Sequence, residues 1–78
     1  SVLEALKVGG VIEETDIEDL NAAMATSRFS TIDKVYQNLL NGSYSHLRAF
    51  AGKIESVTGQ PYAAQVVSQE VVDSILGA

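Results

Sequence analysis

Four polar residues are spaced so that two helices could bring them to one place. Glu13 and Asp16 are three residues apart in the first half of the chain, and Ser43 and His46 are three residues apart in the second half. Side chains three apart lie on the same side of a helix, so each pair would present its polar groups together. Carboxylates and imidazole bind transition metals, and they also form ion pairs. The residue types therefore point to metal binding or to a buried charged pair.

The first pair lies in a predicted helix with apolar residues at spacings of three and four, which is typical of a bundle. This stripe consists of Leu3, Leu6, Gly10, Glu13, Ile17, Leu20 and Met24. Glu13 lies at its centre and Asp16 about 60° to one side, so Glu13 should point inward and Asp16 could. The other acidic residues are expected in solvent: Glu14, Glu18 and Asp19. A kink or short break is expected near Gly9 or Thr15.

The second pair lies in the helix that the sequence predicts most clearly. Its stripe repeats at spacings of four and three without interruption: Tyr36, Leu40, Ser43, Leu47, Phe50, Ile54 and Val57. Ser43 lies at the centre of the stripe. His46 lies about 60° away, on the side that Asp16 occupies on its own helix. Both polar pairs therefore fall at the middle of an otherwise apolar seam.

Capping and turn residues predict where the remaining segments begin and end. Residues 25–31 form a polar connection, with Ser30 as the N-cap of the second helix. Gly59 should end that helix. After a loop, Ser68 should cap a short helix over residues 69–76 that carries apolar residues on one side.

Composition excludes several classes of function. The chain has 78 residues, no cysteine and a net charge of -5. Disulfides and thiolate metal sites are therefore excluded. An acidic chain offers no basic surface to nucleic acid or an anionic membrane, and no apolar run approaches the ~20 residues of a membrane span. We expect a soluble, cytoplasmic protein that forms one domain over residues 1–78, with no nucleic-acid or membrane partner.

The elements together predict an all-α fold: an antiparallel helical hairpin followed by a short C-terminal helix. Two helices cannot cover both of their own apolar stripes, so the exposed seam must pack against another helical pair. We expect either a homodimer that completes a four-helix bundle or a missing N-terminal half that does the same.

Two stretches of the chain resemble a known family. KVGGVIEETDIEDL and VYQNLLNGSYSHLRAF are similar to the third and fourth helices of a ferritin-like, rubrerythrin-type domain. They resemble most closely an uncharacterised ferritin-like family of unknown function. The resemblance covers Leu3 to Leu76 and implies that this chain is the C-terminal helical pair of such a bundle.

The resemblance also implies a set of metal ligands. Di-iron members carry inward carboxylates on four helices, with a Glu-x-x-His pair on two of them. Glu13 stands at the place of the third-helix glutamate, Asp16 at that of a second carboxylate, and His46 at that of the fourth-helix histidine. Ser43 departs from the pattern, because it stands where Glu-x-x-His has its glutamate. The implied cofactor is iron, in a di-iron or remnant site, or manganese. The implied function is iron handling or the chemistry of oxygen or peroxide.

The residues alone leave structural interpretations open. Glu13 could pair with His46 or with an arginine of a neighbouring helix, because a buried carboxylate needs a hydrogen bond, a cation or a proton. Asp16 could be a helix cap or an exposed acid. A triad of Ser43, His46 and Glu13 would lack an oxyanion hole, so no catalytic residue is predicted.

A second hypothesis therefore belongs to a different class of function. The chain would be a non-catalytic helical module whose apolar seam binds a second copy or another partner. Its buried polar pairs would set the register of the helices, as a polar residue can in a coiled coil, and the metal site would be degenerate and hold no cofactor.

Overall fold

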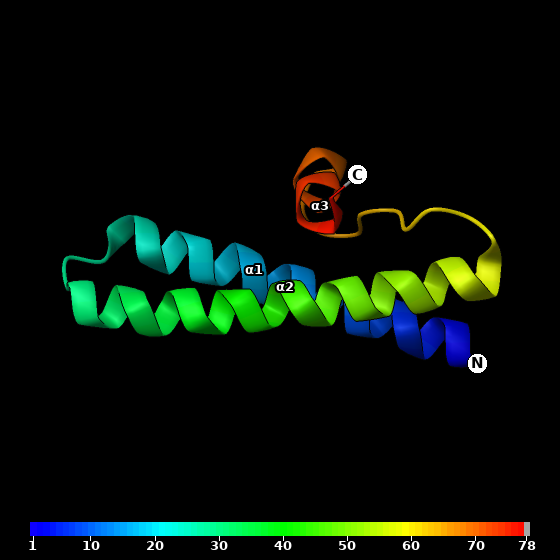
Figure 1. Cartoon of the computed structure of the whole chain (residues 1–78), viewed down its shortest axis with the longest axis horizontal. Helices are drawn as coiled ribbons and strands as arrows, with labels where there is room; N and C mark the ends of the chain where they lie inside the picture. Colours follow the sequence, from blue (N-terminus) through cyan, green and yellow to red (C-terminus); the bar gives the residue numbers. More distant parts are fainter. Residues whose placement is uncertain (78) are drawn as a thin grey trace.

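The chain folds into a long helical hairpin crossed by a short helix (Figure 1). The computed structural model describes residues 1–77, which form α1 (Val2–Thr26), α2 (Ser30–Thr58) and α3 (Gln69–Leu76). This confirms the predicted all-α hairpin with a short C-terminal helix. At about 1.5 Å per residue, α2 alone accounts for the longest dimension of 43 Å.

The first helix is continuous over Val2–Thr26, so the predicted short break near Gly9 or Thr15 is wrong. Its N-cap is Ser1, whose hydroxyl accepts a hydrogen bond from the amide of Glu4 at 3.1 Å. Gly9 and Gly10 are both buried. Packing over both glycines outweighs their weak helix propensity, because tertiary contacts contribute more to helix stability than propensity does.

The second helix begins one residue earlier than the capping rule suggested. Its N-cap is Phe29, and Ser30 is already the first helical residue, so the predicted cap at Ser30 is wrong. The hydroxyl of Ser27 accepts a hydrogen bond from the amide of Phe29 at 3.3 Å. Gly59 ends the helix as predicted, with a φ of 70° that glycine adopts without strain.

The third helix runs across the hairpin and is seen nearly end-on in Figure 1. Ser68 caps it as predicted, accepting a hydrogen bond from the amide of Val71. At its other end, Arg48 Nε of α2 donates to the carbonyl of Ile75 at 2.9 Å. The core lies between the hairpin and this helix and consists of Ile17, Leu40, Leu47, Ala51, Ile54, Tyr62, Val72 and Ile75.

The opposite side of the hairpin carries large apolar residues in solvent. Their exposed fractions are 53% for Ile12, 43% for Ile32, 54% for Val35 and 55% for Leu39. The helical wheel puts all four on the side away from α3. We call these four residues the open face. No helix among residues 1–77 has the length and apolarity that a membrane crossing requires.

Candidate functional site

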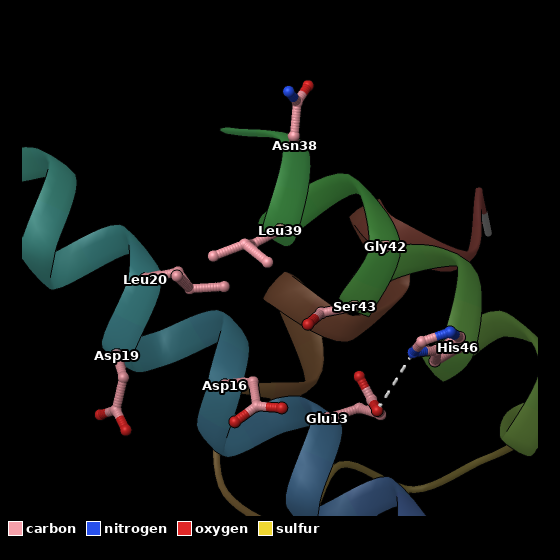
Figure 2. A pocket seen from close by; sticks show the side chains of 9 residues that line it. All are labelled: Glu13, Asp16, Asp19, Leu20, Asn38, Leu39, Gly42, Ser43 and His46. Atoms are coloured by element: carbon pink, nitrogen blue, oxygen red, sulfur yellow. Dashed lines mark ion pairs between the residues drawn. The ribbon is translucent and has the colours of Figure 1, made fainter. Parts of the chain in front are cut away.

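A hollow opens between α1 and α2 beside the open face (Figure 2). Its lining comes from both helices: Glu13, Asp16, Asp19, Leu20, Asn38, Leu39, Gly42, Ser43 and His46. The side chains of Glu13 and His46 point toward one another across it, whereas those of Asp19 and Asn38 point outward at its rim. The helical register that the sequence predicts thus brings Glu13, Asp16, Ser43 and His46 to one hollow.

Glu13 and His46 are in direct contact. His46 Nδ1 lies 3.3 Å from Glu13 Oε1, and the side chains differ in exposure, at 67% for His46 and 12% for Glu13. This distance exceeds the usual 2.7–2.9 Å of a charge-assisted hydrogen bond. The contact orients the two side chains without using the full binding capacity of either.

The second oxygen of the Glu13 carboxylate has no partner among residues 1–77. Glu13 Oε2 is buried, and no residue in the described chain donates a hydrogen bond to it. None of the described residues that line the hollow is Lys or Arg. A buried carboxylate oxygen without a donor or cation is unfavourable by several kcal/mol in a fully desolvated site. This oxygen is therefore available to a cation or to a hydrogen-bond donor from outside the described residues.

The other predicted site residues lie nearby but do not complete a metal site. Asp16 is exposed at the edge of the hollow, and Ser43 is buried with an exposed fraction of 7%. Within residues 1–77, no three side chains of His, Cys, Asp and Glu form a group that could hold a metal ion. The hollow measures about 520 Å³. One water molecule occupies about 30 Å³ in the liquid, so there is room for side chains from another segment.

Glu14 is buried, so the prediction that it lies in solvent is wrong. Its exposed fraction is 0%. Its two oxygens accept hydrogen bonds from the Tyr62 hydroxyl at 2.5 Å and from the backbone amides of Gln65 at 3.0 Å, Val66 at 2.8 Å and Val67 at 3.1 Å. Burial is tolerated because these donors replace water.

The donors to Glu14 come from residues 60–68, which we call the strap. This segment returns from the end of α2 to α3 (Figure 1). It passes over Gly10, which lies one turn before Glu14 on the same side of α1. A Cβ atom on Gly10 would overlap the Tyr62 hydroxyl. The spacing of Gly10 and Glu14 is the signal in the sequence that could have identified this second contact side of α1.

The buried phenol gives the first testable prediction. Burial, together with the hydrogen bond to Glu14, raises the pKa of Tyr62 to about 12 from its usual 10.0. A raised folded pKa means that the stabilisation is complete below pH 10 and is lost as the pH rises through about 12. The difference in tyrosinate absorbance between the wild type and Tyr62→Phe should report this late titration. Ionisation of Tyr62 at its ordinary pKa would contradict the buried hydrogen bond.

Comparisons with known proteins match the whole chain to an uncharacterized family and to an uncharacterized relative. The family model described as Uncharacterized protein domain (DUF2202) matches residues 1–78. The uncharacterized protein MJ0754 of Methanocaldococcus jannaschii is 37% identical over 78 residues, which are 100% of this chain and 42% of that protein. The crystal structure of this hypothetical protein superposes with a TM-score of 0.90, covering 44% of its chain. The present chain thus spans less than half of the relative that it matches.

Proposed function

We propose a function for this chain, which belongs to the family of the Uncharacterized protein domain (DUF2202), from the side chains that line the hollow. The hairpin is the second helical pair of a ferritin-like bundle, and Glu13 and His46 bind a transition-metal ion. Asp16 is the third candidate ligand, since it lines the same hollow.

The buried, unpartnered Oε2 of Glu13 carries this proposal. A metal ion would satisfy this oxygen, and the neighbouring imidazole of His46 supplies a nitrogen ligand of the kind that iron and manganese accept. These two residues supply donor atoms of the types that such a metal accepts, and the remaining ligands are not present among residues 1–77. Bound iron or manganese would supply one-electron redox chemistry toward oxygen or peroxide.

The missing ligands are proposed to come from outside this chain. Carboxylates from a further helical pair would reach the hollow if that pair packed on the open face, where Ile12 and Leu39 are more than half exposed. The relative from Methanocaldococcus jannaschii is more than twice as long as the matched region, which leaves length for such a pair in that protein. A second copy of this hairpin is the alternative source.

The test is thermal unfolding of the full-length protein with and without Fe²⁺ or Mn²⁺. Metal should raise the melting temperature of the wild type, with a stabilisation of about 2.7 kcal/mol at a free concentration about one hundred times the Kd. Glu13→Gln keeps the size of the side chain but removes its charge, so the metal effect should disappear. Glu18→Gln changes an exposed carboxylate of the same helix and should retain it. A wild-type melting temperature that metal does not move would end the metal proposal.

A second candidate function rests on the open face. Its exposed apolar residues, and the lack of a three-ligand group among residues 1–77, favour a non-catalytic module that binds a second copy or another helical partner. The same experiment separates the two candidates. A purely structural Glu13 would make Glu13→Leu neutral or stabilising in the absence of metal, because an apolar side chain would fill the seam.

A further inference from the structure

The strap surrounds Glu14 with donors in an arrangement that is itself a binding site. Three consecutive backbone amides, those of Gln65, Val66 and Val67, point at one carboxylate, and the Tyr62 hydroxyl completes the set. We propose that residues 62–67 form a carboxylate-binding cradle. Glu14 occupies this cradle and thereby latches the strap and α3 to the hairpin.

The cradle is built for the shape of a carboxylate. Consecutive backbone N–H groups form a concave site for anions without any basic side chain. Oε1 of Glu14 accepts hydrogen bonds from all three amides, and Oε2 accepts from the Tyr62 hydroxyl and, at 3.1 Å, from the amide of Gln65. Since both oxygens are bound, a planar anion with two oxygens fits this site better than a spherical halide.

The role of Glu14 as a latch follows from the way the strap is attached to α1. Apart from the bonds to Glu14, its side-chain hydrogen bond to α1 is the one from Gln65 Nε2 to the carbonyl of Lys7, at 2.9 Å. The far end of α3 is held separately, by Arg48 at the carbonyl of Ile75. Hence the hydrogen bonds between the strap and α1 depend mainly on one carboxylate, while α1 and α2 also contact one another directly along the hairpin.

Replacing Glu14 with alanine and adding acetate tests the cradle. Alanine keeps Cβ, and acetate has the atoms of the missing methylene and carboxylate, so the two together rebuild the glutamate side chain. In Glu14→Ala, amide hydrogen exchange at Gln65, Val66 and Val67 should accelerate about tenfold or more. Amides of the α1–α2 hairpin should keep their protection. Millimolar to molar acetate should restore strap protection in a saturable manner.

Matched additives and variants decide the outcome. Chloride at equal ionic strength and neutral acetamide should not restore protection, and Glu18→Gln should behave as the wild type. Restoration by chloride as effectively as by acetate, or unchanged strap exchange in Glu14→Ala, would overturn the proposal. If Glu14→Ala unfolds altogether, recovery of its helical circular dichroism by acetate but not by chloride supports the cradle, and failure of acetate overturns it.

A second variant tests the cradle with the carboxylate in place. Tyr62→Phe removes one donor but leaves the three backbone amides, so strap protection should fall less than in Glu14→Gln, whose amide group turns a donor toward donors. Equal loss of strap protection in the two variants would contradict a site built mainly from backbone N–H groups.

Discussion

Replacing Gly10 with alanine is expected to lower the free energy of unfolding by about 2 to 5 kcal/mol. The added Cβ would overlap the Tyr62 hydroxyl and lie 2.9 Å from Gln65 Nε2. Tyr62 must then move away from Glu14, which loses a buried hydrogen bond in addition to the overpacking. Urea unfolding followed by circular dichroism measures the change.

Gly52→Ala is the matched control for this prediction. Gly52 is exposed in the middle of α2, and its added Cβ would meet nothing within 4 Å among the described residues. Alanine should therefore stabilise the protein by roughly 0.5 to 1 kcal/mol through helix propensity alone. If the two variants differ by less than about 1 kcal/mol, the close packing of the strap on Gly10 is wrong.

The parts of the fold that depend on local sequence could be predicted. The stripe of α2 contains Leu40, Leu47 and Ile54, which are all buried, and the ends at Gly59 and Ser68 follow from capping chemistry. The errors arose where two local rules competed with packing. Burial of Gly9 and Gly10 overrode the expected break, and Phe29 is the N-cap of α2 in place of Ser30, with no side-chain hydrogen bond that caps the helix.

One part of the candidate site could likewise be predicted from the sequence, and another part could not. The contact between Glu13 and His46 could be predicted, because both lie on the seam that helical periodicity reports. The donors to Glu14 could not be predicted, because they are 48 to 53 residues away in the sequence. Periodicity identifies the side of a helix that faces a neighbouring helix. It does not identify a polar side of a helix that a loop covers, as the strap covers Glu14 of α1.

Two leucines on α2 differ in their surroundings: Leu47 lies in the core, and Leu39 lies on the open face. This difference gives the second large prediction. Leu47 has an exposed fraction of 0%, so Leu47→Ala should lower the free energy of unfolding by about 2 to 5 kcal/mol through lost contacts and a cavity. Leu39 is 55% exposed, so Leu39→Ala should change the stability of the isolated chain by about 0.5 kcal/mol or less.

The roles of the two leucines should reverse when assembly is measured. If the open face packs against a further helical pair or a second copy, Leu39→Ala should weaken that association, because a leucine buried at an interface contributes about 1.5 to 3 kcal/mol of transfer free energy. Light scattering on the full-length protein, or on the present chain over a range of concentrations, measures the association. A Leu39→Ala variant that associates as the wild type does would show that this surface stays in solvent, and the source of further metal ligands would then have to be sought elsewhere around the hollow.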